Sequence, residues 1–161
     1  MGKRSFQFGT WNDKPIEWEV LKEDDFKTMV ITREAIGKRT FSSKSKNIWK
    51  ESELRYFLQE DFFKNAFSKE EKRRIINTKL TDVGDSKDNV FILSEGEVSS
   101  LLNPTDYYEQ KITGCSNCLW TRSPFGNNSY QVIIKRGNCD GSCWKSSGDT
   151  RAIRPVMYIK K

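Results

Sequence analysis

The four cysteines are the residues whose type and spacing could most directly support chemistry. They form two close pairs, C-S-N-C over 115–118 and C-D-G-S-C over 139–143. Two such pairs, separated by about twenty residues, can wrap a tetrahedral zinc ion with four thiolates. The second pair has one more intervening residue than the commonest zinc knuckle. The spacing therefore predicts a structural zinc held by Cys115, Cys118, Cys139 and Cys143, with two disulfides or unpaired thiols as the alternatives.

Histidine is absent from the chain, which excludes a Ser-His-Asp triad, a Cys-His dyad and any histidine-ligated zinc. The acidic residues Glu51, Glu53, Asp85 and Asp88 are expected on or beside helix starts, where the helix dipole favours negative charge. Neither a phosphate-binding loop nor a dinucleotide-binding glycine pattern occurs in the sequence. The sequence therefore predicts a protein that is not an enzyme and has no catalytic residues.

The stretch 114–149 is rich in Gly, Asn, Ser, Cys and Arg, with isolated aromatic residues. Rigid aromatic side chains beside adaptable polar ones are typical of binding surfaces. Trp120 is expected in the core instead, and Arg122 and Arg154 are expected to brace the loops through buried hydrogen bonds. The residues predicted to form the ligand surface are Phe125, Asn127, Asn128, Tyr130, Arg136, Asn138, Asp140, Trp144, Ser146 and Asp149.

The elements that must position these residues begin with strands. Apolar residues alternate with polar ones around Phe6 and Phe8 and again from Ile16 to Val20, with turn residues between them, and a third apolar run covers 29–31. Period-two alternation of this kind predicts a meander of half-buried antiparallel strands.

The middle third is predicted to be helical. Ser52 and Ser68 can cap helices, and Glu71 completes a capping box with Ser68. A short buried strand is expected over 89–93, followed by a helix over 95–102 that Ser94 caps. In the last third only 130–134 and 156–159 read as strands. The chain is therefore predicted to be one α+β domain over residues 1–161, with N-terminal antiparallel strands, two to three central helices and a loop-rich C-terminal sheet.

Several sequence blocks, in order along nearly the whole chain, resemble a bacterial and phage domain family of unknown function. The blocks are F-Q-F-G-T-W (6–11), I-E-W-E-V-L (16–21), W-K-E-S-E-L-R-Y-F-L (49–58), F-S-K-E-E (67–71), D-N-V-F-I-L-S-E-G-E (88–97), W-T-R-S-P (120–124) and I-R-P-V (153–156). The resemblance implies a C-type-lectin-like fold, in the branch shared with formylglycine-generating enzymes. It also implies a ligand surface on the C-terminal loops, as in the variable proteins of diversity-generating retroelements.

The resemblance leaves two alternatives to a non-catalytic domain that binds a protein or a glycan. A copper- and oxygen-dependent enzyme similar to formylglycine-generating enzymes would use Cys139 and Cys143, although their spacing is one residue too short for that family. A nucleic-acid-binding accessory domain is the other alternative.

The net charge of +6 is diffuse, because the basic run 72–74 directly follows two glutamates. Interleaved charges usually mark a solvated helix face, so nucleic acid is not the expected partner. The sequence shows no membrane segment and no signal peptide, and the expected location is cytoplasmic or phage-associated. The oligomeric state is not predicted.

Overall fold

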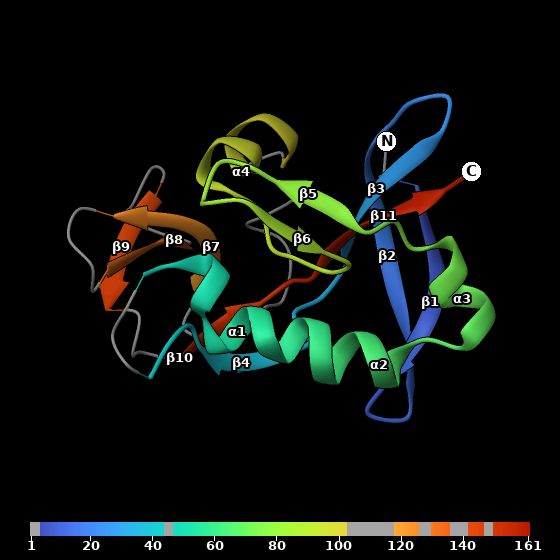
Figure 1. The fold of residues 1–161 in the computed structure, drawn as a ribbon, viewed down its shortest axis with the longest axis horizontal. Helices are drawn as coiled ribbons and strands as arrows, with labels where there is room; N and C mark the ends of the chain where they lie inside the picture. Colours follow the sequence, from blue (N-terminus) through green and yellow to red (C-terminus); the bar gives the residue numbers. More distant parts are fainter. Residues whose placement is uncertain (1–3, 44–46, 103–117, 126–129, 136–141, 147–149) are drawn as a thin grey trace.

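The computed structural model describes residues 4–43, 47–102, 118–125, 130–135, 142–146 and 150–161. These residues form a mixed α+β structure with two main sheets at opposite ends and helices and a short hairpin between them (Figure 1). The α+β class predicted from the sequence is confirmed. None of the described helices is both long and apolar enough to cross a membrane.

The N-terminal sheet joins the beginning of the chain to its last strand. It contains β1 (Ser5–Trp11), β2 (Lys14–Glu23), β3 (Lys27–Thr32) and β11 (Val156–Lys160), in the order β1-β2-β3-β11. All neighbouring strands are antiparallel. Asn12 and Asp13 turn the chain between β1 and β2 with φ angles of 51° and 61°, which these two residue types tolerate better than most. The predicted N-terminal meander is confirmed.

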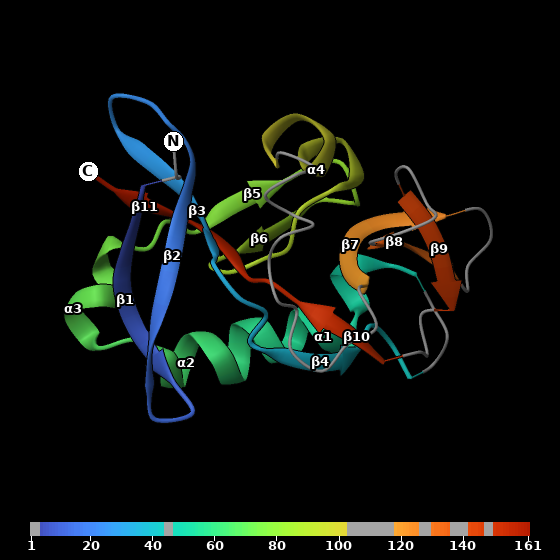
Figure 2. The ribbon, with the colours of Figure 1, turned by 180° about the vertical axis from the view of Figure 1, so that it is seen from behind.

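The C-terminal sheet contains β4 (Gly37–Thr40), β10 (Thr150–Ile153), β7 (Cys118–Phe125), β8 (Tyr130–Lys135) and β9 (Ser142–Ser146), in that spatial order. Its pairs are antiparallel except for a parallel contact between β10 and β7. The sequence predicted β8 and β11 as the strands of the last third, and it missed β4, β7, β9 and β10. Figure 2 shows this sheet from behind, with β7, β8 and β9 at the end of the molecule opposite the N-terminal sheet and β4 and β10 beside α1.

A helical segment runs between the two sheets (Figure 1). A 3-10 turn, η1 (Trp49–Glu51), precedes it, Ser52 has extended backbone, and the helix then runs without a break through α1 (Glu53–Tyr56), a π-helical stretch η2 (Phe57–Phe62) and α2 (Phe63–Ala66). The Ser52 side chain caps α1 by accepting the Arg55 N–H, as predicted. The predicted capping boxes are also present at α3 (Lys69–Arg74) and α4 (Glu95–Leu101).

The sequence predicted a strand over 89–93, but these residues form none, and a two-stranded hairpin, β5 (Thr78–Leu80) and β6 (Ser86–Asp88), lies just before them. That prediction was wrong because the side chain of Gln59, and no neighbouring strand, bonds the backbone of Asn89 and Val90. Phe91 makes a single isolated bridge to Val156. The segment is buried as expected, but its hydrogen bonds do not form a ladder.

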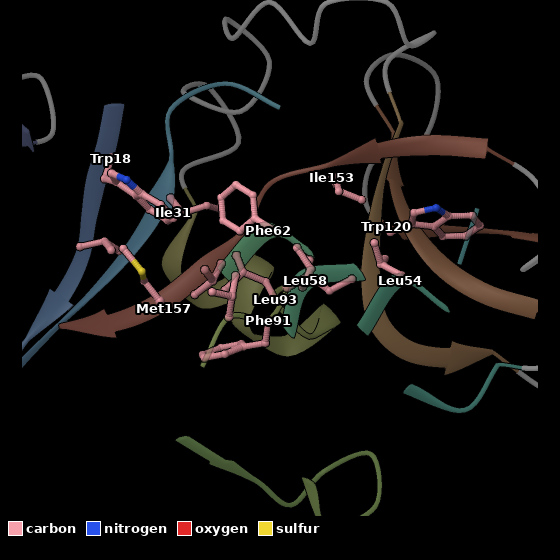
Figure 3. Packing of buried hydrophobic residues seen from close by; sticks show 14 of the residues in the cluster. Trp18, Ile31, Leu54, Leu58, Phe62, Phe91, Leu93, Trp120, Ile153 and Met157 are labelled. Atoms are coloured by element: carbon pink, nitrogen blue, oxygen red, sulfur yellow. The ribbon is translucent and has the colours of Figure 1, made fainter. Parts of the chain in front are cut away.

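The buried hydrophobic residues form one cluster that reaches both sheets (Figure 3). Trp18 and Met157 belong to the N-terminal sheet, Leu58 and Phe62 to the helical segment, and Trp120 to the C-terminal sheet. The largest fully buried side chains are the aromatic ones of Trp18, Trp49, Phe41, Phe62 and Phe91, which helps a chain with 35% hydrophobic residues to fill a core. The C-terminal sheet is therefore held by the same core as the N-terminal one.

Candidate functional site

The backbone register of the C-terminal sheet gathers three of the predicted ligand-surface residues into one row. Phe125 at the end of β7 pairs with Tyr130 at the start of β8, and Tyr130 pairs with Ser146 at the end of β9. Trp144 pairs with Val132, two positions further along β8. Residues from three different strands therefore meet at one end of the β7–β8–β9 ladder. The other predicted residues, Asn127, Asn128, Arg136, Asn138, Asp140 and Asp149, lie outside the described residues.

Two of the four cysteines lie on strands of the same sheet. Cys118 on β7 pairs with Lys135, and Cys143 on β9 pairs with Ile133, so strand β8 separates the two cysteines. Neighbouring strands lie about 4.8 Å apart, which puts these Cα atoms at least ~9.5 Å from each other. A disulfide needs Cα atoms within about 7 Å, so Cys118 and Cys143 are not disulfide partners in this register. The four-cysteine zinc site stays a prediction, because Cys115 and Cys139 lie outside the described residues, and the described part of the chain contains no other group of metal-ligating side chains.

Arg122 on β7 ties the strand that leads into Phe125 to three other segments. Its Nε donates to Oδ1 of Asp82 at 3.2 Å, its Nη2 forms an ion pair with Oδ2 of Asp82 at 3.1 Å, and its Nη1 donates to the Ile92 carbonyl at 2.8 Å. The same Nη1 pairs with the Glu97 carboxylate, which also belongs to the capping box of α4. With 4% of its surface exposed, Arg122 is a buried brace, as predicted.

Trp120 and Arg154 provide two further attachments of this part of the chain. The indole Nε1 of Trp120 donates to the Arg39 carbonyl on β4 at 2.8 Å, and its ring meets Phe41 edge to face with centroids 5.8 Å apart. The Nε of buried Arg154 donates to the Thr32 carbonyl on β3 at 2.8 Å, which links the two sheets. The predicted core position of Trp120 and the predicted bracing role of Arg154 are confirmed.

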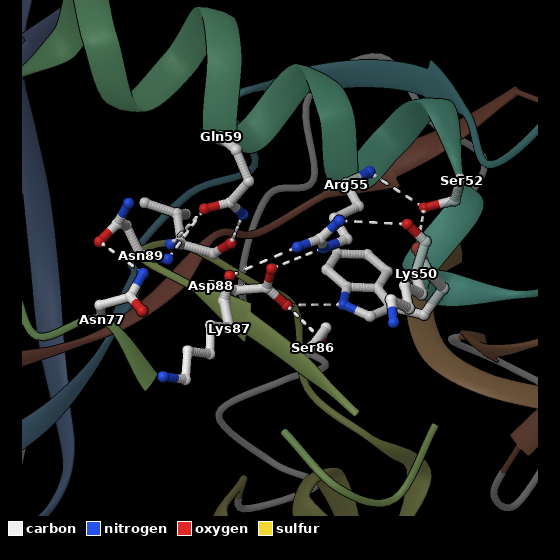
Figure 4. A network of polar contacts seen from close by, with 11 residues as sticks. Lys50, Ser52, Arg55, Gln59, Asn77, Ser86, Lys87, Asp88 and Asn89 are labelled. Carbon is white, nitrogen blue, oxygen red and sulfur yellow. Dashed lines mark hydrogen bonds and ion pairs between the residues drawn. The ribbon is translucent and has the colours of Figure 1, made fainter. Parts of the chain in front are cut away.

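A buried aspartate at the end of β6 is the centre of a polar network that sequence reasoning missed (Figure 4). Asp88 is fully buried, and its carboxylate accepts from the Trp49 indole at 2.9 Å, the Arg55 Nε at 2.6 Å and the Ser86 hydroxyl at 2.8 Å. Asp88 had been expected beside a helix start, and that expectation was wrong. Asp85 likewise lies in the β5–β6 hairpin.

Arg55 and Gln59 lie four residues apart on one face of the helix. Their side chains form hydrogen bonds with the backbone of β6 and of the two residues that follow it, where a third strand could otherwise pair. The Arg55 Nη2 donates to the Lys87 carbonyl at 3.3 Å, and Gln59 accepts the Asn89 N–H at 2.8 Å and donates to the Val90 carbonyl. A polar hollow of about 340 Å³ lies beside this network. Because Asp88 already has three donors, its role is to join the helix to the hairpin.

Residues 26–161 match the model of a protein family described as a domain of unknown function (DUF6273). The match covers most of the chain, and the protein belongs to this family. No curated protein and no solved structure matches the chain. The resemblance to a domain family of unknown function is therefore confirmed, and the relation to C-type-lectin-like folds stays a prediction.

Proposed function

We propose that this protein is a non-catalytic ligand-binding domain whose C-terminal sheet and loops present the contact surface. The observation that carries the proposal is the register of β7, β8 and β9, which aligns Phe125, Tyr130 and Ser146 in one row and puts Trp144 two positions further along the ladder. Aromatic residues beside hydroxyl and amide groups suit protein and glycan ligands, because the rings give contact area and the polar groups give hydrogen bonds.

The bracing of this sheet supports the proposal. Arg122 and Trp120 attach β7 to the hairpin, to helix α4 and to β4, and buried Arg154 attaches the neighbouring segment to β3. A surface that binds by rigid anchors loses less entropy on binding when the scaffold already holds its strands. The anchors of the scaffold lie at positions distinct from those proposed to touch the ligand.

The C-type-lectin-like fold is part of the same proposal. Such folds combine a short terminal antiparallel sheet, two helices and a loop-rich sheet. Strand β11 returning to β3, the helical segment between the sheets, and the five-stranded C-terminal sheet are consistent with that plan. The fold by itself does not determine the ligand.

The proposal is tested by binding to a printed glycan array and to a display library of protein domains. Replacing Trp144→Ala or Tyr130→Ala should remove binding to whichever ligand is found and leave the thermal midpoint nearly unchanged. Tyr56→Ala is the matched control, because Tyr56 is an exposed aromatic residue on α1, outside the C-terminal sheet. Binding that survives both C-terminal substitutions and is lost in Tyr56→Ala would contradict the proposal.

We further propose that the surface is diversified by a retroelement. Mutation of asparagine codons at adenines yields Asn, Ser, Tyr, Cys, Gly, Asp, Arg and Ile, and these types are common in 114–149. Sequencing the 3′ end of the gene across a natural population should find substitutions concentrated in codons 115–151. An invariant 3′ end would contradict the proposed diversification, and the protein would then be a binding domain of fixed sequence.

A further inference from the structure

A groove lies between the β1–β2 turn and the segment that joins β3 to β4, away from the β7–β8–β9 ladder. It consists of two adjoining hollows of about 510 and 160 Å³, which share Trp11, Asn12 and Ile36 as lining residues. Residues 11–17 line one side and residues 33–39 line the other. We call this hollow surface the β1–β4 groove.

Trp11 and Ile36 give the β1–β4 groove an apolar part that is continuous with the core. The ring of half-buried Trp11 meets Phe57 and Phe62 edge to face, with centroids 5.8 and 5.1 Å away. Ile36 is half-buried, and the Arg39 guanidinium carbon lies 3.4 Å from the centre of the Phe57 ring. A bulky apolar side chain entering the groove would contact Trp11 and Ile36 and lose part of its hydration.

The rim of the groove carries an excess of positive charge. Arg33 and Glu17 neutralise each other through a contact of 2.7 Å. Lys14 and Lys38 form no ion pair within the described ranges of the chain, and Glu34 is the remaining carboxylate of the lining. The whole chain, rim included, has a net charge of +6, and this charge attracts acidic partners over distances near the Debye length.

Strand β4 supplies backbone along the smaller hollow. Among the described residues it is the terminal strand of the five-stranded sheet and pairs with β10 alone, and it exposes Gly37, Lys38 and Arg39. The free edge of such a strand can accept an extended peptide, with main-chain bonds giving affinity and a neighbouring pocket giving specificity.

We propose that the β1–β4 groove docks an extended acidic segment of another protein, with one bulky apolar side chain against Trp11 and Ile36. A nucleic acid suits this surface less well, because Glu17 and Glu34 belong to the lining and part of the groove is apolar. A second copy of this chain is also disfavoured, because two molecules of charge +6 repel each other. The groove and the C-terminal surface would then bind two different partners.

The test is selection of a yeast-displayed library of random peptides, about 12 residues long, against the intact chain. The enriched peptides should carry several Asp or Glu residues around a Phe, Trp or Leu, and their affinity should fall as salt is raised. The Lys38→Glu substitution should weaken binding at least about tenfold, because it reverses a rim charge on an exposed strand. Lys69→Glu is the matched control on α3, and it should leave affinity unchanged.

The Ile36→Asp substitution should also abolish binding, and a thermal melt shows whether this half-buried site still folds. Selection of peptides without acidic character would overturn the proposal, as would affinity that Lys38→Glu does not alter. Self-association of the chain that disappears in Lys38→Glu would identify a second copy of the chain as the occupant of the groove and would overturn the proposal that another protein binds there. The Trp144→Ala variant should still bind the peptides, which would show that the groove binds independently of the proposed C-terminal surface.

Discussion

Removing the charge of Asp88 should lower the free energy of unfolding more than a change at the surface does, because Asp88 connects the helical segment to the β5–β6 hairpin. In Asp88→Asn the Arg55 guanidinium loses its carboxylate, and the Trp49 and Ser86 donors face a neutral amide. Breaking a buried ion pair by changing one partner typically costs ~3–5 kcal/mol. The Arg55 side chain keeps 24% exposure, so water screens part of the loss, and we expect about 3 kcal/mol of unfolding free energy.

Urea unfolding followed by tryptophan fluorescence measures this loss. Asp85→Asn is the matched control, because its carboxylate is 70% exposed and stands 3.9 Å from Lys79. The control should change the unfolding free energy by less than about 0.5 kcal/mol. An Asp88→Asn variant that stays within about 1 kcal/mol of the wild type would refute the account of this network. A double-mutant cycle with Arg55→Gln would then show whether the pair is coupled at all.

Three further predictions follow from backbone geometry, pH and the cysteines. Gly9→Ala should cost at least about 2 kcal/mol in urea unfolding, because Gly9 has a φ of 73° and an added Cβ would lie 2.7 Å from the Phe67 ring. Burial opposes ionisation of Glu71, but the hydrogen bonds from the Ser68 and Gly9 N–H groups outweigh burial and hold the pKa of Glu71 below the usual 4.5. The ionised Glu71 carboxylate therefore stabilises the fold above pH 4.5, and this stabilisation is lost as the pH falls through the folded-state pKa. The stability gap between the wild type and Glu71→Gln should therefore narrow in acid unfolding curves below pH 4.5, and a constant gap would contradict this. Mass spectrometry of digested, non-reduced protein should find no peptides linked through Cys118 and Cys143, and zinc content measured on the same sample tests the four-cysteine site.

Local signals in the sequence predicted the elements that depend on neighbours in the chain. The caps at Ser52, Ser68 and Ser94 and the period-two strands around Trp18 need only residues within a few positions. Strand β4 could not be predicted this way, because it pairs with β10 more than one hundred residues later. Short strands stabilised by such distant partners carry little pattern of their own.

The candidate site, like the fold, has features that local sequence signals predicted and features that depend on distant contacts. Composition indicated the C-terminal region, and residue type indicated that Arg122 is buried, because a guanidinium can satisfy several carboxylate and carbonyl acceptors at once. The alignment of Phe125 with Tyr130 and Ser146 depends on strand register, which the sequence leaves open. The Asp88 network joins residues 33 and 39 positions apart, and no spacing rule predicts that contact.

The most direct test of the central claim compares two tryptophans of the C-terminal sheet. Trp120 is 3% exposed and belongs to the core, so Trp120→Ala should cost ~3–5 kcal/mol of unfolding free energy. If Trp144 serves the ligand surface as proposed, Trp144→Ala should cost less than about 0.5 kcal/mol in the same urea titration. A Trp144→Ala variant destabilised as strongly as Trp120→Ala would make Trp144 a core residue and contradict the proposed binding surface.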